Sequence, residues 1–382
     1  MKSIFDYNPI MHEALTRLQF RVDQASKENV NLFDETWYSK HFKMNTVPHI
    51  RGEFATVLGK KHITIAASTI NGKSSEPIRM NQGFYEHAQK MFTHAHAFKM
   101  TSDEILGLLD VVEIAKKNGD KSAVNYIVDT LLNHTKEAVD GVNARLDLII
   151  LSALSNEGVH TITKENDPQS PFVGMSMSFG LPEANKAVVG ADKKWYNATA
   201  KTWNSVLQST IDPIVEINDV LKRQRTKIKK ILLDEATLDF IMGCDKMKNY
   251  VNSVLYPNMP LDINMLNAWM RQHNKPEFEV VYREICVQNG DSISEPIAPW
   301  RTGQLVFIPD EQIGTIETKF TEKERGIVDE GVKYANSGRI ELRRMAYGER
   351  DGGEYYELLK AGITAAPAMD TIDRILTLDT TK

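Results

Sequence analysis

One run of helical periodicity constrains this chain more than any other feature. Between about residues 122 and 156, apolar side chains recur at helical spacing without a break. The pattern is carried by Val124, Ile127, Val128, Leu131, Leu132, Ala138, Val139, Val142, Leu146, Ile149, Ile150 and Ala153. At about 1.5 Å per residue the helix would be roughly 50 Å long, with Gly141 inside it allowing close packing or a bend. Such a helix, without a heptad repeat, predicts an elongated, flattened molecule with one spine.

A β-rich stretch, residues 46–98, precedes the helical part of the chain. Lys61–Ala67 alternates like a strand, Asn71-Gly72 is a hairpin turn signal, and a second strand follows through Pro77. The stretch is rich in charge and poor in large aliphatic residues, and an isolated hairpin is marginally stable in water. It therefore predicts an arm that a neighbouring chain stabilises. The residues expected at that contact are Arg51, Lys60, Lys61, Lys73, Glu76 and Arg79.

The first 45 residues combine an amphipathic helix, Pro9–Val22, with an aromatic segment at 31–45. The aromatic segment has too little apolar material to form a core of its own. It packs either on its own domain or on another chain, and Trp37 and Tyr38 are the candidates for a contact between subunits.

The second half of the chain predicts a compact α/β lobe of about 130 residues, beginning near Thr210 after a turn-rich stretch at 157–209. Helices are expected after Asp212, Asp234 and Asp262. Strands are expected at 229–233, 278–287 and 304–308. The final residues, 338–382, alternate like strands again. We expect them to pair near the spine helix, which makes the α/β lobe an insertion.

Composition limits the functional classes. The 382 residues suffice for two or three lobes, and 42% hydrophobic with 25% charged residues is ordinary for a globular protein. No apolar run approaches the roughly 20 residues that span a bilayer, so we expect a soluble protein without a membrane partner. The two cysteines, Cys244 and Cys286, cannot form a disulfide framework and are expected to be buried thiols.

A basic run stands out against the net charge of −5. Six of the nine residues from 222 to 230 are Lys or Arg, and the candidates for a functional patch are Lys222, Arg223, Arg225 and Lys227. The run faces either nucleic acid or an acidic neighbour, or it is a solvated surface. A free-standing DNA-binding domain would be distinctly basic, so any contact with DNA has to be local.

Catalytic motifs are missing from the sequence. Gly59-Lys60-Lys61 lacks the spacing of a phosphate-binding loop, and neither Gly-x-Ser-x-Gly nor His-Glu-x-x-His occurs. His94 and His96 would point the same way from a strand and leave a metal-binding protein as an alternative, with His87 or His62 as a third ligand. We otherwise expect no enzyme activity and no cofactor.

The order of these parts resembles the tailed-bacteriophage major capsid fold, the Hong Kong ninety-seven-like fold, and within it the lambda head protein family. The resemblance is carried by Lys61–Gly72 with Pro77-Ile-Arg, by Asn143–Leu154, by Ile231–Phe240, by Leu305–Pro309 and by Ala365–Met369. It implies an α+β fold with an N-terminal arm (1–45), an extended β-hairpin loop (46–99), a peripheral domain with the long spine helix (100–209 and 341–382) and an inserted α/β axial domain (210–340).

The same resemblance implies a function as a shell subunit. Copies of the chain would form pentamers and hexamers of an icosahedral shell around double-stranded DNA, assembled in the host cytoplasm and found in the virion. Only about 45 residues precede the extended loop, so we expect a separate scaffolding protein, with a portal and a decoration protein as further candidate partners. The alternative with the same fold is an encapsulin-like nanocompartment shell that encloses enzyme cargo.

Overall fold

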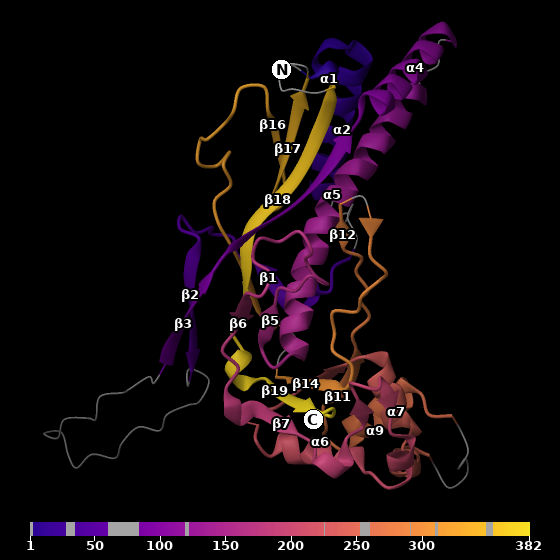
Figure 1. Cartoon of the computed structure of the whole chain (residues 1–382), viewed down its shortest axis with the longest axis vertical. Helices are drawn as coiled ribbons and strands as arrows, with labels where there is room; N and C mark the ends of the chain where they lie inside the picture. The colour runs from indigo at the N-terminus through magenta and orange to yellow at the C-terminus, as the bar shows by residue number, and fades with distance from the viewer. Residues whose placement is uncertain are drawn as a thin grey trace, which may run out of the picture.

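The computed structural model describes residues 3–27, 35–59, 84–118, 122–224, 226–252, 260–290, 292–309, 312–348 and 354–382. Figure 1 shows an elongated molecule, with a helical tip at one end and a lobe around a small sheet at the other. One long helix runs between them. No helix of the described part of the chain is long and apolar enough to cross a bilayer.

The spine helix α5 spans Ser122–Ser155, as the periodicity predicts. Helix α4, Ser102–Asn118, lies beside its first half at the helical tip. The residue before α4 caps it, one position earlier than expected: Thr101 and Glu104 form a capping box, in which the backbone N–H of Thr101 donates to the Glu104 carboxylate at 2.7 Å.

A six-stranded sheet lies against the spine helix and is organised around the 13-residue strand β18, Tyr356–Ala368. Its other strands are β1 (Phe42–Met44), β4 (Phe92–Met100), β15 (Gly314–Thr318), β16 (Lys333–Ser337) and β17 (Ile340–Tyr347). Strand β18 pairs antiparallel with β4, β15 and β17. The central strand of this sheet therefore comes from the C-terminal part of the chain, as the alternation there predicts.

The main core lies between the spine helix and this sheet. Val142, Leu146 and Ile150 of α5 are buried in the same cluster as Ala361 and Ile363 of β18. Gly141 permits a close approach at this interface, because a Cβ built on it would lie only 2.7 Å from Nδ1 of His96 on β4. The close packing expected at Gly141 is thereby confirmed.

The N-terminal helices α1 (Ile4–Tyr7) and α2 (Pro9–Lys27) pack at the helical tip. Phe5 and Met11 are fully buried there against Ile105 of α4 and Ile127 of α5. The amphipathic helix predicted at Pro9 is present and extends beyond Val22. Helix α3, Tyr38–His41, follows and leads into β1.

A second, five-stranded sheet organises the lobe at the other end, and its order is β11-β10-β14-β19-β7. These strands are β7 (Lys186–Val188), β10 (Lys230–Leu233), β11 (Glu277–Val280), β14 (Gln304–Ile308) and β19 (Leu376–Asp379). Its helices are α6 (Pro213–Leu221), α7 (Glu235–Gly243), α8 (Asp245–Val251) and α9 (Ile263–Gln272). The remaining short strands are β5 (Val159–Thr161), β6 (Ser176–Ser178), β8 (Tyr196–Asn197), β9 (Thr202–Trp203), β12 (Gln288–Asn289) and β13 (Ser292–Ile293).

Several local expectations need correction. The helix after Asp234 is two helices, because the chain turns to an extended conformation at Cys244. The strand expected at 278–287 ends at Val280. Cys244 is buried as predicted, but Cys286 is exposed, so it is not a core thiol.

The two sheets also cut across the domain boundaries that the sequence predicts. Strands β7 and β19 lie outside 210–340, yet they pair with each other and β19 pairs with β14 in the lobe sheet. Strands β15 and β16 lie inside 210–340, yet they belong to the six-stranded sheet. The α/β lobe is therefore completed by strands from both sides of the insertion.

Candidate assembly surfaces

The root of the extended hairpin is an antiparallel pair, β2 (Glu53–Gly59) and β3 (Phe84–Lys90), which joins neither large sheet in the described part of the chain. Phe54 anchors the pair by packing with Met91, Ala366 and Ala368 at the end of β18. The pair projects from the side of the molecule (Figure 1).

A polar contact fixes the same root to the segment that follows the spine helix. The carbonyl of Ser178 on β6 lies 2.9 Å from Nε2 of His87 and accepts from the Gln89 amide at 3.4 Å. Arg51, one of the expected contact residues, is exposed beside this root. The other expected hairpin contacts lie outside the described residues: Lys60, Lys61, Lys73, Glu76 and Arg79.

Two aromatic residues of the segment at 31–45, Trp37 and Tyr38, lie inside their own chain. Trp37 and Tyr38 are each 8% exposed and pack in the main core of their own chain. Their backbone N–H groups donate to the two carboxylate oxygens of Asp147 on the spine helix, at 3.1 and 2.8 Å. The Tyr38 hydroxyl donates to Asn143 at 2.9 Å. Burial leaves these side chains little surface for another subunit, which corrects their assignment as inter-subunit contacts.

Asp147 joins three parts of the molecule. Its carboxylate is fully buried, binds the segment around Tyr38, and forms an ion pair with Arg283 of the α/β lobe at 2.9 Å. Burial raises the pKa of Asp147, although the Tyr38 N–H and Arg283 oppose the change. Burial and the Asp147 charge raise the pKa of Tyr38 to about 12. The sequence held a signal for this site, an acid between Leu146 and Leu148 in an apolar stretch.

A second ionic contact joins the same N-terminal segment to the lobe. Nε2 of the buried His41 lies 3.6 Å from Glu279 on β11, whose other oxygen is 2.8 Å from Nζ of Lys230. The contacts with His41 and Lys230 outweigh burial and lower the pKa of Glu279 to about 2. Glu279 is therefore ionised at neutral pH.

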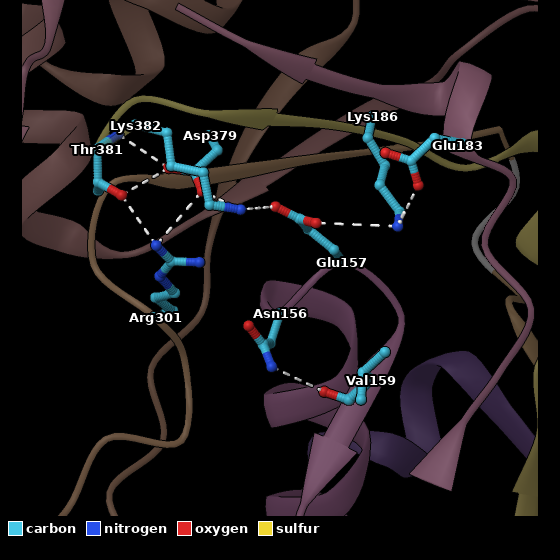
Figure 2. Close-up of polar contacts among 9 residues, drawn as sticks. All are labelled: Asn156, Glu157, Val159, Glu183, Lys186, Arg301, Asp379, Thr381 and Lys382. Carbon is cyan, nitrogen blue, oxygen red and sulfur yellow. Dashed lines mark hydrogen bonds and ion pairs between the residues drawn. The ribbon is translucent and has the colours of Figure 1, made fainter. Parts of the chain in front are cut away.

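Figure 2 shows a third junction, where the end of the spine helix meets the C-terminal residues. Asp379 is 1% exposed and lies 3.3 Å from Arg301 and 3.2 Å from Lys382. Lys382 also contacts Glu157, just after the spine helix, and Glu157 lies 3.9 Å from Lys186. Burial alone would raise the pKa of Asp379, but hydrogen bonds from Thr381 and the two cations lower it below its usual value.

The basic run is exposed but partly neutralised within the chain. Lys222 pairs with Asp219 at 2.5 Å, and Nη1 of Arg223 donates to the Lys186 carbonyl at 2.9 Å. Lys227 is exposed, and Arg225 lies outside the described residues. These contacts fit a solvated turn after α6.

The candidate metal ligands among the described residues, His87, His94 and His96, are not assembled into a metal site, and His62 lies outside the described residues. His94 and His96 lie on the same side of β4 and line one pocket with His160. Across the described part of the chain, no group of three or more His, Cys, Asp or Glu side chains is placed to hold a metal ion. The histidines line the same pocket as Arg145. The positive charge of Arg145 would repel a metal cation bound there.

Comparison with known proteins identifies the fold of this chain. No family model matches the sequence, and no curated protein matches it. A solved structure described as the capsid protein of a prophage of Escherichia coli CFT073 matches with a TM-score of 0.55 at 10% identity, over 95% of this chain and 98% of that chain. The match thus includes both sheets and the spine helix. This chain has the Hong Kong ninety-seven-like capsid fold.

Two further structures resemble the chain less closely. A phage-related protein from Bordetella bronchiseptica RB50 has a TM-score of 0.43 at 11% identity, over 90% of this chain and 91% of that chain. A virus-like particle from Pyrococcus furiosus has a TM-score of 0.40 at 7% identity, over 97% and 100%.

Proposed function

We propose that this protein is the major capsid protein of a tailed phage, a structural subunit and not an enzyme. Its copies form pentamers and hexamers of an icosahedral shell that encloses double-stranded DNA without reading its sequence. The observation that carries the proposal is the capsid fold, matched over nearly the whole of both chains.

The surface of the subunit supports assembly with further copies. The hairpin root is not part of either sheet, and β16 lies at the edge of the six-stranded sheet. At the helical tip, Leu106, Ile114 and Tyr126 are each more than half exposed. Neighbouring subunits would cover such surfaces, and modest contacts repeated by symmetry stabilise a closed shell even where each one is weak.

The proposal extends to finer features that follow from the resemblance. The protein would be closest to the lambda head proteins and would belong to the virion, with a scaffolding protein, a portal and a decoration protein as candidate partners. Residues 46–99 would form the extended loop, with Arg51, Lys60, Lys61 and the charges near Arg79 contacting a neighbouring subunit. The exposed turn at Lys222–Lys227 would face DNA or an acidic neighbour.

Deletion of Lys60–Arg79 tests the assembly role of the hairpin. The truncated protein should remain folded, because the described cores lie outside the deletion, but it should not close shells. Negative-stain electron microscopy and circular dichroism of both forms, each expressed alone and with the adjacent candidate scaffold gene, measure the two properties. The exposed-site substitution Lys323→Glu serves as a control that keeps the hairpin.

Normal shells from the deleted protein would refute the role of the hairpin. A persistent small monomer of the intact protein under both conditions would refute the shell function itself. Shells that contain an enzyme and no nuclease-protected DNA would support the nanocompartment function in place of the phage head.

A further inference from the structure

A pocket of about 300 Å³ lies between β4, the middle of the spine helix and the segment at 160–172. This volume is at the lower end of the range of about 300–1,000 Å³ for small-molecule sites. Phe92 and Phe172 form part of its wall, with ring centroids 5.5 Å apart. The assembly surfaces described above do not use this pocket.

Arg145 and three histidines bring guanidinium and imidazole nitrogens to the pocket, which Thr93, Asp167, Gln169 and Ser170 also line. Arg145 projects from the spine helix with its side chain 23% exposed, and its Nη1 donates to the Asn166 carbonyl at 2.6 Å. Nη2 lies 3.5 Å from Asp167, a longer separation than a well-formed charge-assisted hydrogen bond. Part of the guanidinium therefore remains available to a ligand.

The histidines add buried nitrogens to the same pocket. His160 is 1% exposed, and its Nδ1 has no hydrogen-bond partner among the described residues. A buried polar atom without a partner is rare and requires an explanation, such as a bound group that the protein atoms do not show. His94 and His96 line the pocket from β4.

We propose that this pocket binds one small oxyanion of the phosphate or sulfate class, held by Arg145 and His160 with His94 and His96 beside it. The planar guanidinium matches two oxygens of a tetrahedral anion, and an imidazole N–H donates to a third. The single carboxylate lining the pocket, Asp167, is 30% exposed in its side chain and lies 3.5 Å from Nη2 of Arg145, so the anion would bind on the remaining donors of the guanidinium. The site does not depend on the proposed shell function.

Proton uptake should accompany binding. Burial, followed by the charge of Arg145, lowers the pKa of both His94 and His160 to about 4. The charged and titratable groups that line the pocket are Arg145 and Asp167, together with His94, His96 and His160. A bound anion offsets the charge of Arg145 and favours the protonated imidazoles, so its affinity should rise as the pH falls through the range below about 6.5.

Equilibrium dialysis with labelled sulfate tests the site on the intact protein. Sulfate keeps the same charge over this pH range. Dialysis counts bound anions directly, so the general stabilising effect of sulfate on proteins does not affect the result. At constant ionic strength in chloride, we expect one sulfate per chain, bound at least about threefold more tightly near pH 5 than near pH 7.5. Binding that is absent, or equal at the two pH values, would overturn the proposal.

Two substitutions locate the site. Arg145→Gln should weaken sulfate binding about tenfold or more, and His160→Gln should reduce its pH dependence. Arg271→Gln is the matched control, because Arg271 is an exposed arginine of the α/β lobe with one distant ion pair, to Glu277 at 3.8 Å. Equal affinities for Arg145→Gln and Arg271→Gln would place the anion elsewhere. If Arg145→Gln does not fold, the pH dependence of the unmodified protein still decides the question.

Discussion

At the scale of single residues, a few buried charges determine how the parts of the subunit are connected. Asp147 and Glu279 each bind the segment at 37–41 and also a cation of the α/β lobe. Buried ion pairs of this kind add little net stability, but they specify one arrangement, because removing a partner leaves an uncompensated charge. Their sequence signals are weak, since partners far apart in the sequence meet only in the folded chain.

Glu279 makes the stability of the protein depend on acidity. Its pKa is about 2 in the folded chain and ordinarily near 4.5, so the folded form binds fewer protons than the unfolded form between these values. The contribution is present above about pH 4.5 and is lost as the pH falls toward 2, up to about 3 kcal/mol in all.

Urea unfolding of the unassembled protein between about pH 2.5 and 5.5 measures this effect. The free-energy difference between the native sequence and Glu279→Gln should shrink as the pH falls. A difference that stays constant over the window would show that the pair with His41 and Lys230 does not lower the pKa.

At the scale of elements, the spine helix illustrates how one glycine serves packing. Gly141 lies in the middle of α5, where glycine costs about 1 kcal/mol relative to alanine. Close packing compensates for this loss of helix propensity, because His96 of β4 occupies the space that a side chain at position 141 would need. Gly107 in α4 has no atom within 4 Å of its Cβ position and receives no such compensation.

The two glycines therefore predict opposite effects of the same substitution. Gly107→Ala should stabilise the protein by about 0.5–1 kcal/mol, through helix propensity alone. Gly141→Ala should destabilise it by about 1–3 kcal/mol, because the added methyl displaces the His96 ring near its Cβ. Chemical denaturation of both variants provides the comparison, and stabilisation by both would show that His96 moves freely.

At the scale of the whole molecule, three polar junctions hold the long subunit together, and they differ in burial. The Asp147 junction is inside the protein, whereas Lys382 at the junction shown in Figure 2 is 49% exposed in its side chain. The proposed role as a shell subunit would require the spine and the lobe to keep one defined arrangement. The buried junction should therefore dominate.

Asp147→Ala should destabilise the unassembled protein by about 3–5 kcal/mol, because it leaves Arg283 and two backbone N–H groups without their acceptor. Lys382→Ala should cost less than about 1 kcal/mol, as expected for an exposed ion pair. Unfolding free energies from denaturant titration distinguish the two. Similar losses would mean that the exposed junction is as important as the buried one.

The sequence by itself determined the local elements of this protein. The spine helix, the side-chain cap at Asp212, the helix that begins after Asp262, the strand at 304–308 and the order of parts that resembles a capsid subunit follow from periodicity and turn chemistry, which act over a few residues. Only the tertiary structure decided which strands complete each sheet, as with β7 and β19. It also placed Trp37 inside the chain and gathered Arg145 with three histidines around one pocket. These outcomes depend on contacts between distant segments, whose free energy comes from burial in a shared core and is not encoded in any short pattern.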